Sequence, residues 1–349
     1  MDQRVIISTH LENELVSALS ECEHDKLFVL TDTTTLEKCL PVLQKFYCMK
    51  EAKVITIPAS DSHKDIESLM MVWKGLQEGG ASRHSCMINL GGGMVTDLGG
   101  FAASTFKRGI NFINIPTTLL AMVDASVGGK TGINFGGLKN EVGVFNDSKF
   151  VILDTEFLKT LDAENICSGY AEMLKHSLLE SEAMWADHLK FDFAQPDFAH
   201  LQKLVAQSIG VKQRIVEEDP HEHGIRKALN LGHTVGHAFE ALALEREQPV
   251  LHGYAVAWGL LCELYLSVVH CHFPTPVMQQ TVRFIREVYG PFGFTCNDYE
   301  HLYALMLHDK KNTDGVINFT LLSDIGTIEL NQHLTKEQVF ESFDFLREG

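Results

Sequence analysis

The stretch NLGHTVGHAFE, residues 230–240, places two histidines four positions apart in a mostly apolar sequence. On an α-helix this spacing brings His233 and His237 to one face, with Cβ atoms about 5–6 Å apart. Apolar residues cover much of the remaining circumference, which predicts a helix buried inside a domain. The two imidazoles are therefore either core side chains satisfied by hydrogen bonds or ligands of a metal ion.

A third histidine and a carboxylate favour the metal. His252 stands where a second apolar run, LHGYAVAWGLL, begins, so a short loop can return it to the first pair. A catalytic zinc site needs three protein ligands and an open position, and histidine and carboxylate are ordinary ligands. Glu172, in the run SGYAEMLKHSLL, is the candidate carboxylate, because an unpaired buried charge is costly. The HExxH pattern of zinc proteases is absent, since Thr234 stands at the position of its glutamate.

The whole chain has 349 residues, a formal net charge of −17 and eight cysteines without a CxxC pair. This length favours two domains. The cysteine spacing suggests neither a thiolate zinc knuckle nor a disulfide framework, which fits a reducing, cytoplasmic location. The acidic balance argues against a nucleic-acid partner. We also expect neither a signal peptide nor a membrane span, because the longest uncharged runs are interrupted by asparagine and proline.

The order of the expected elements predicts the fold class. Strand-like runs begin near residues 5, 27, 53, 86 and 110, and runs with helical spacing lie at 36–46, 65–78 and 95–105. This alternation predicts a parallel sheet covered by helices on both faces, with ligands at the carboxyl ends of the strands. After FVILD, residues 150–154, long helices dominate. We therefore predict an α/β domain over residues 1–155 and a mainly helical domain over residues 156–349.

Two further segments indicate anion binding. Gly91-Gly92-Gly93 follows an expected strand and precedes a helix, where backbone N–H groups can face a phosphate, although a tight turn without a ligand could have the same sequence. Asp97 is expected in the first turn of that helix, where it could serve only to stabilise the terminus. The run PTTLLAMVDASVGGKTGIN, residues 116–134, combines two hydroxyls, an acid, paired glycines and Lys130.

Several more basic residues follow along the chain: Lys139, Lys175, Lys212, Arg226, Lys310 and Lys311. Each alone fits a solvated surface. Together they predict a basic pocket for an anionic small molecule, in spite of the negative total charge.

These motifs together resemble the 3-dehydroquinate synthase family. The resemblance runs from about residue 32 to 326 and is carried by GGGMVTDLGGFAASTFKRG, IPTTLLAMVDASVGGKTGIN, LKNEVG, GYAEMLKH, LNLGHTVGHAFE, LHGYAVA and DKKN, in that order. It implies a Rossmann-like N-terminal domain that binds NAD and a mainly helical C-terminal domain that holds zinc or cobalt, with the active site in the cleft between them. It also implies a cytoplasmic homodimer.

The resemblance implies three sets of site residues. The metal ligands are Glu172, His233 and His252, the set that the residues themselves suggest. The NAD contacts are Asp32, Asp61, Lys64, Gly92, Gly93, Asp97, Thr117, Thr118, Lys130, Lys139, Phe157, Thr160 and Leu161. The substrate contacts are Arg108 (reaching into the partner subunit), Lys130, Asn140, Lys175, Lys212, Arg226, Asn230, His237 and one of Lys310 and Lys311. Lys130, Lys175, His237, Asn140 and Asp124 are assigned to catalysis.

The implied activity is that of a lyase in the shikimate pathway to chorismate and the aromatic amino acids. A ring hydroxyl of 3-deoxy-D-arabino-heptulosonate 7-phosphate is oxidised by NAD, which acidifies the neighbouring C–H so that phosphate can leave. The ketone is then reduced again, and ring opening with aldol closure gives 3-dehydroquinate. Asp61, Leu138 and Asp162 replace a glutamate, a glycine and a proline that are usual in the family. These departures affect adenosine contacts and loop shape.

Three other interpretations share some of these features. Metal-dependent glycerol and iron-type alcohol dehydrogenases have a GGG turn and histidine ligands, but they do not need Lys130, Lys212 and Arg226 together. Other sugar phosphate cyclases are expected to alter the residues that meet the substrate carboxylate, whereas Lys212, Arg226 and Asn230 all match. The third is a zinc-stabilised binding protein without activity, descended from the enzyme, and the intact ligand and NAD motifs give it little support.

Overall fold

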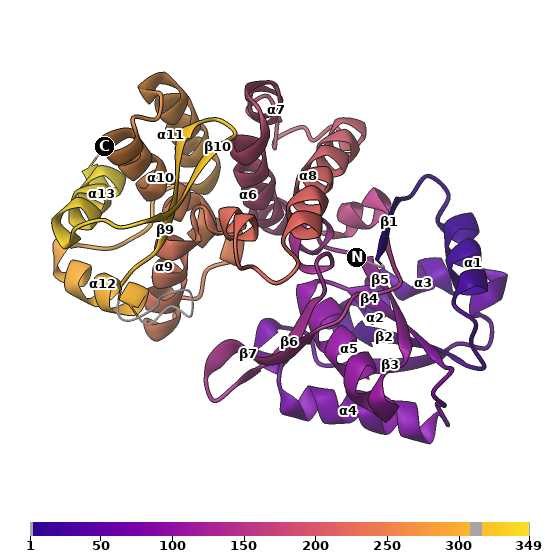
Figure 1. Ribbon diagram of the computed structural model, residues 1–349. Coiled ribbons are helices and arrows are strands. Elements are labelled where there is room, and N and C mark those ends of the chain that lie inside the picture. The colour runs from indigo at the N-terminus through magenta and orange to yellow at the C-terminus, as the bar shows by residue number, and fades with distance from the viewer. Residues whose placement is uncertain (1–2, 308–315, 349) are drawn as a thin grey trace. The chain divides into compact units, whose positions relative to one another are not determined.

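The computed structural model describes residues 3–307 and 316–348 (Figure 1). The chain divides into two compact units, Met1–Asp162 and Ala163–Gly349. The boundary predicted after residue 155 falls at the start of a 3₁₀ turn, Thr155–Thr160, which belongs to the first unit.

A six-stranded parallel sheet forms the centre of the first unit (Figure 1). In spatial order its strands are β1 (Arg4–Ile7), β8 (Phe150–Leu153), β5 (Asn111–Pro116), β4 (Cys86–Gly91), β2 (Leu27–Asp32) and β3 (Lys53–Ile57). Every residue of β2 and β4 is buried, as expected for parallel strands covered on both faces. The predicted parallel sheet is confirmed.

The helices of the first unit are α1 (Leu11–Glu21), α2 (Thr33–Lys38), α3 (Leu40–Leu43), α4 (Ile66–Glu78) and α5 (Gly93–Thr105). Short turns lie between them: η1 (Tyr47–Met49), η2 (Asp61–His63), η3 (Phe106–Arg108), η4 (Ala121–Ala125) and η5 (Thr155–Thr160). The prediction of one helix over residues 36–46 is wrong. Asp32 accepts hydrogen bonds from the N–H groups of Thr34 and Thr35 and so starts α2 earlier, and Pro41 in the first turn of α3 cannot continue a preceding helix.

The position of Asp97 also differs from the prediction. Gly92 is the N-cap of α5 and Gly93 its first residue, so Asp97 lies beyond the first turn. The sequence analysis also missed an antiparallel hairpin, β6 (Lys130–Phe135) with β7 (Leu138–Phe145). In this hairpin Ile133 packs into the core of the unit, together with residues of β2, α4 and α5.

The second unit is mainly helical, as predicted (Figure 1). Its elements are α6 (Ala163–Glu180), α7 (Glu182–His188), α8 (Phe198–Glu218), η6 (Ile225–Asn230), α9 (His233–Glu245), α10 (His252–Cys271), α11 (Thr275–Tyr289), η7 (Cys296–Asp298), α12 (Tyr299–Leu307), β9 (Phe319–Asp324), β10 (Thr327–Gln332) and α13 (Lys336–Glu348). Strands β9 and β10 pair as an antiparallel hairpin.

Helix α10 is the central element of this unit, because it packs against α6, α9, α11, α13 and β9. Its length of 20 residues and mean hydropathy of 1.4 would also suit a membrane span, but 67% of the apolar window is buried inside the protein. A helix that is apolar on all sides and enclosed by other elements is a core helix.

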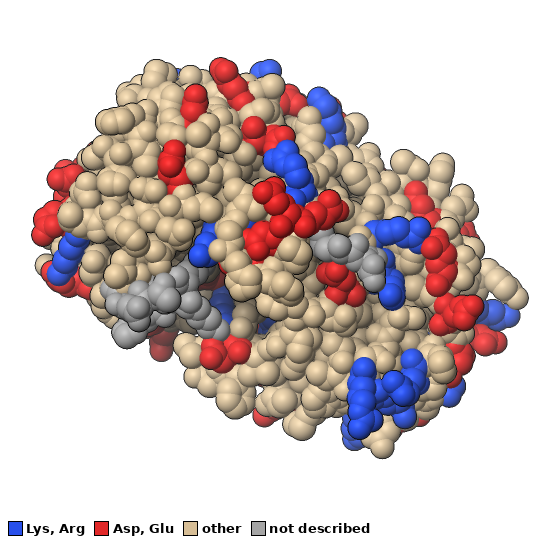
Figure 2. All heavy atoms as spheres, in the orientation of Figure 1, with Lys and Arg blue, Asp and Glu red and all other residues tan. Residues whose placement is uncertain are grey.

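Charged residues are spread over the surface that Figure 2 presents. Acidic and basic side chains alternate there with uncharged ones, and the basic residues form small separate groups. Although the whole chain has a net charge of −17, the acidic side chains on this face do not form one continuous patch.

Candidate active site

Three helices of the second unit bring the predicted metal ligands together. Glu172 lies in the middle of α6, while His233 and His252 are the first residues of α9 and α10. The Nε2 atoms of His233 and His252 lie 3.2 Å and 3.5 Å from Oε1 of Glu172. His237 joins them, since His233, His237 and His252 each offer a nitrogen within 4.8 Å of the others.

Close helix packing explains why residues so far apart in sequence meet. A Cβ on Gly253 would lie only 1.8 Å from the carbonyl oxygen of Ser168. The absence of a side chain there lets α10 begin directly against α6, and the N–H of Gly253 donates to Oγ of Ser168 at 3.1 Å. Ser168 lies one turn of α6 before Glu172, so this contact holds His252 close to Glu172.

Hydrogen bonds orient both imidazole rings. Nδ1 of His233 lies 3.1 Å from the carbonyl oxygen of Leu231, and Nδ1 of His252 lies 3.2 Å from Oε2 of Glu240. A carbonyl or carboxylate oxygen can only accept, so Nδ1 carries a proton in each ring, and a metal ion would need to displace only a proton from Nε2, the nitrogen that faces Glu172. Carboxylate and carbonyl partners of this kind commonly orient metal-bound histidines. The sequence analysis gave Glu240 no role, although it is the one acidic residue in the quoted histidine stretch.

The two oxygens of Glu172 have different surroundings. Oε2 forms a buried ion pair with Lys175, one turn along α6. Burial works to raise the pKa of the Glu172 carboxyl, but Lys175 and His233 outweigh this effect and hold the pKa well below its ordinary value. The group is therefore ionised. Oε1 is fully buried and makes no hydrogen bond of normal geometry with the described residues.

This arrangement attracts a positive charge. Burial would lower the pKa of His252, but the nearby carboxylates of Glu172 and Glu240 outweigh it and raise the pKa to about 10. Two Nε2 atoms and one carboxylate oxygen that converge in this way also match the nitrogen and oxygen ligand set of a divalent metal such as zinc. The residues present thus fit a metal ion held by Glu172, His233 and His252.

The predicted basic residues of the second unit lie on neighbouring elements. Lys212 of α8 and Arg226 of η6 are both buried, and α8 packs against η6. The guanidinium of Arg226 donates from Nη1 to the carbonyl oxygen of Pro220 at 2.5 Å, and Nδ2 of Asn230 donates to Oε1 of Glu222 at 3.0 Å. The predicted residues Lys310 and Lys311 lie outside the described part of the chain.

In the first unit, several predicted cofactor residues form one polar cluster. The buried Lys64 pairs with Asp97 and donates to Oδ1 of Asn140 at 2.5 Å. Lys139, next to Asn140 in β7, pairs with Asp61 at 3.2 Å. Asn140 has a left-handed backbone (φ 51°), which turns its side chain toward Lys64 within the strand. Asp97 therefore serves as the partner of a buried lysine, and not as a charge at the helix terminus.

The glycine turn joins β4 to the N-terminus of α5. Gly91 ends β4 and its carbonyl accepts from the N–H of Thr117 at 2.9 Å. A Cβ on Gly92 would lie 3.0 Å from Cγ2 of Thr118, so the two segments are in contact. Helix α5 begins at Gly93 without a side-chain cap, which leaves its first N–H groups for a ligand.

Asp32 and the predicted turn around Phe157 lie at opposite ends of α2. Oδ1 of Asp32 accepts two hydrogen bonds of 2.8 Å, from the N–H groups of Thr34 and Thr35, and so caps the first turn of that helix. Oγ1 of Thr160 bonds to the carbonyl of buried Phe157 at 2.7 Å and lies 3.9 Å from Sγ of Cys39, the residue after α2. Leu161 ends the turn.

The remaining predicted residues of this unit occupy irregular backbone. Asp124 lies in a π-helical turn, Ala121–Ala125, a rare conformation that is frequent at functional sites. The exposed Lys130 is the first residue of β6. Arg108 is exposed and, like Lys107 before it, has a positive φ (70° and 50°), an unusual conformation for residues other than glycine.

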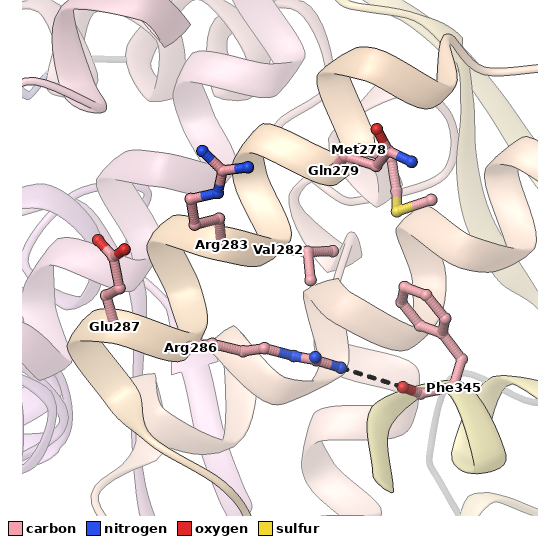
Figure 3. Close-up of a pocket in the computed structure, with 7 residues that line it drawn as sticks. All are labelled: Met278, Gln279, Val282, Arg283, Arg286, Glu287 and Phe345. Carbon is pink, nitrogen blue, oxygen red and sulfur yellow. Dashed lines mark hydrogen bonds between the residues drawn. The ribbon is translucent and has the colours of Figure 1, made fainter. Parts of the chain in front are cut away.

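An open hollow on the surface of the second unit contains none of these residues. Figure 3 shows its lining, which comes from α11 and from Phe345 of α13. Arg286 reaches across it and donates to the carbonyl oxygen of Phe345 at 3.1 Å.

Comparison with known proteins agrees with the geometry. Residues 54–168 match the family model of the 3-dehydroquinate synthase N-terminal region, and residues 169–312 match that of the C-terminal region. A curated 3-dehydroquinate synthase of Parabacteroides distasonis is 53% identical over 348 residues, which cover 100% of this chain and 99% of the relative.

Solved structures share the fold at lower identity. One is 2-epi-5-epi-valiolone synthase of Streptomyces hygroscopicus subsp. jinggangensis with NAD⁺ and Zn²⁺ bound, at a TM-score of 0.88 and 24% identity over 99% of this chain and 97% of that one. Another is 2-deoxy-scyllo-inosose synthase complexed with carbaglucose-6-phosphate, NAD⁺ and Co²⁺, at 0.85 and 20% over 99% and 96%. At these identities the structures show the fold alone.

The family resemblance found in the sequence motifs is thus confirmed by matches to both halves of the chain and by a relative that it covers completely. The chain belongs to the 3-dehydroquinate synthase family.

Proposed function

We propose that the protein is a 3-dehydroquinate synthase, which converts 3-deoxy-D-arabino-heptulosonate 7-phosphate to 3-dehydroquinate and phosphate. The full-length identity of 53% to a curated 3-dehydroquinate synthase carries the proposal. The convergence of Glu172, His233 and His252 supports it, because these are the metal ligands that the family resemblance implies. The enzyme would act in the cytoplasm, on a small anionic sugar phosphate.

NAD and a divalent metal, zinc or cobalt, are the proposed cofactors. When bound, NAD would accept and return a hydride, and the metal would polarise oxygens of the substrate. Oε1 of Glu172 and the two Nε2 atoms that face it would hold the metal. The pyrophosphate of NAD would lie against the turn at Gly92 and Gly93, where the N-terminus of α5 presents N–H groups.

The polar residues around this turn would hold the rest of NAD. The Lys64 cluster, with Asp61, Asp97 and Lys139, would place the ribose and the phosphates. Thr117 and Thr118 lie beside the glycine turn, which supports their assignment as NAD contacts. The same role is proposed for Asp32, Lys130, Phe157, Thr160 and Leu161.

Basic residues would position the substrate's two anionic groups. Arg226 and Lys212, which share one region of the second unit, would bind the carboxylate together with Asn230. His237 lies beside the metal ligands and would face the reacting hydroxyls. Lys175 would keep Glu172 ionised. In the first unit, Lys130, Asn140 and Asp124 would take part in orientation and proton transfer, and one of Lys310 and Lys311 would add a further contact.

We also propose a homodimer. The unusual backbone of Arg108 and its exposure suit a side chain that serves a partner subunit, as the family resemblance implies. Analytical ultracentrifugation would test the dimer. A mixture of two inactive variants, Arg108→Ala and Glu172→Ala, should regain activity if subunits exchange and share sites.

One assay tests the activity itself. Release of phosphate from the heptulosonate phosphate should require NAD, and the amount of NAD should not change over many turnovers. Net formation of NADH would instead indicate a dehydrogenase. Efficient cyclisation of glucose 6-phosphate or sedoheptulose 7-phosphate would indicate another sugar phosphate cyclase.

Substitution of Arg226 by Lys tests how the substrate carboxylate is recognised. A guanidinium can form two parallel hydrogen bonds to a carboxylate, which lysine cannot do. The loss of a charged hydrogen bond costs about 1.5–3 kcal/mol, so kcat/KM should fall roughly 10- to 150-fold. Arg246→Lys is the matched control, since Arg246 also makes two hydrogen bonds, to Gly293 and Asp298, but is not a predicted site residue. Unchanged kcat/KM in Arg226→Lys would contradict the assignment.

A further inference from the structure

Glu263 of α10 is a fully buried carboxylate outside the predicted site. Its Oε2 accepts a hydrogen bond from the N–H of Gly232 at 2.5 Å, and its Oε1 accepts one from the N–H of Val235 at 3.1 Å. These two residues lie on either side of His233, in the first turn of α9. Helix α10 thus supplies the N-terminal cap of the helix that carries His233 and His237.

Helix α9 cannot supply this cap itself. Its N-cap residue is Gly232, which has a left-handed backbone (φ 80°) and no side chain. A Cβ at this position would lie 2.8 Å from Cγ of Leu260 and 3.0 Å from the carbonyl oxygen of Val256, so the usual capping residues do not fit. The first N–H groups of a buried helix still need acceptors, and the positive end of the helix dipole favours a carboxylate there.

We propose that Glu263 is a positioning residue for the metal centre. By holding the N–H groups on both sides of His233, it fixes the turn from which Nε2 of His233 faces Oε1 of Glu172 at 3.2 Å. Metal–ligand distances tolerate deviations of only about 0.2 Å, so a small rotation of this turn would weaken metal binding. The inference rests on the proposed metal site and goes beyond it, because Glu263 acts through the backbone and does not touch the metal.

The variant Glu263→Gln tests this role. Glutamine has the same shape, but its NH₂ group must face one of the two backbone N–H groups, so the turn has to shift. Zinc affinity should fall about 10- to 100-fold, the scale seen when a partner of a metal ligand is lost. The measurement is competition with a chromophoric zinc chelator, using the full chain without substrate. The visible spectrum of the Co²⁺-loaded protein should also change, because it reports the ligand geometry.

Ser267→Ala is the matched control on the same helix. Oγ of Ser267 donates to the carbonyl oxygen of Glu263 at 2.7 Å and accepts from the N–H of Leu322 at 3.1 Å, so its loss should lower stability. A purely structural role of Glu263 would make both variants alike, with a lower melting temperature but wild-type zinc affinity and cobalt spectrum. We expect Ser267→Ala to keep both metal properties and Glu263→Gln to lose them.

The possible outcomes separate this inference from the proposed function. A wild-type protein that binds no zinc would overturn the metal site itself. Equal zinc affinity in wild type and a folded Glu263→Gln protein would overturn the positioning role alone. If Glu263→Gln does not fold, Glu263→Asp keeps the charge but is one methylene too short for both bonds, and it should show the same loss of affinity. If neither variant folds while Ser267→Ala does, Glu263 serves the fold as a whole and the proposal fails.

Discussion

At the scale of single residues, the two carboxylate oxygens of Glu172 have different partners. Oε2 neutralises the buried Lys175, while Oε1 faces the two histidines. A carboxylate divided in this way would bind a metal through one oxygen only. Because both Glu172 and Lys175 are almost completely buried, each is the main compensation for the other's charge before any metal binds.

Substitution of Glu172 by Gln should therefore have two separate effects. Zinc should be lost, because the ionised ligand is gone, and elemental analysis of the purified protein would show it. The metal-free protein should also lose about 3–5 kcal/mol of unfolding free energy, since a buried lysine is left without its partner. Glu300→Gln is the control, because it removes an exposed ion pair to Lys336, which contributes about 0–1 kcal/mol. Full zinc content in Glu172→Gln would contradict the ligand assignment.

At the scale of elements, the contact between α9 and α10 holds the histidines in place. Its closest point is Gly259, where a Cβ would lie 2.0 Å from the carbonyl oxygen of Gly232 and 2.7 Å from the backbone nitrogen of Gly236. Neither of these backbone atoms can move without shifting α9. The first turns of the two helices carry His233 and His252, so the crossing sets the separation of the two ligands.

The variant Gly259→Ala should separate the two helices. We expect a loss of about 3 kcal/mol or more in unfolding free energy, at the upper end of overpacking effects, together with weaker zinc binding. Gly210→Ala is the matched control within the second unit. A Cβ there meets nothing within 4 Å on the exposed side of α8, so alanine should stabilise the protein by about 0.4–1 kcal/mol. Urea unfolding of both variants, with zinc titration of the folded protein, would check this, and unaltered stability in Gly259→Ala would show that the crossing can adjust.

At the scale of the whole molecule, the two compact units hold different proposed ligands. The Lys64 cluster and the glycine turn lie in Met1–Asp162, and the histidine cluster lies in Ala163–Gly349. A ligand stabilises only the state that it binds, by about 2.7 kcal/mol at a concentration of 100 times its Kd. The stabilisation by NAD and by zinc should therefore respond to different substitutions.

Thermal unfolding with each ligand in turn tests this separation. Lys64→Ala removes the centre of the cluster around Asp97 and Asn140, so the rise in melting temperature with NAD should shrink while the rise with zinc persists. Glu172→Gln should show the reverse. If Lys64→Ala reduced both increments equally, the two ligands would not be held independently.

The sequence by itself determined the class of each unit and predicted the residues of the proposed metal site, which the structure brings together. The alternation of strands and helices predicted the parallel sheet, because parallel strands need a crossover connection, which is usually a helix. The spacing of His233 and His237 predicted a shared helix face. Family motifs supplied the other assignments, among them Lys64, Asn140 and Lys212, whose roles remain proposals.

Only the tertiary structure decided how these residues act together. Local patterns cannot show that Gly253 lets α10 begin against α6, that Asp97 pairs with Lys64, or that Glu263 caps α9, because each contact joins segments that lie far apart along the chain. The hairpin β6–β7 is local and was missed for a different reason, because its strands lack a clear alternation of apolar and polar residues over their full length. Spacing along one helix or strand is fixed by backbone geometry, whereas contacts between elements depend on packing that no single segment encodes.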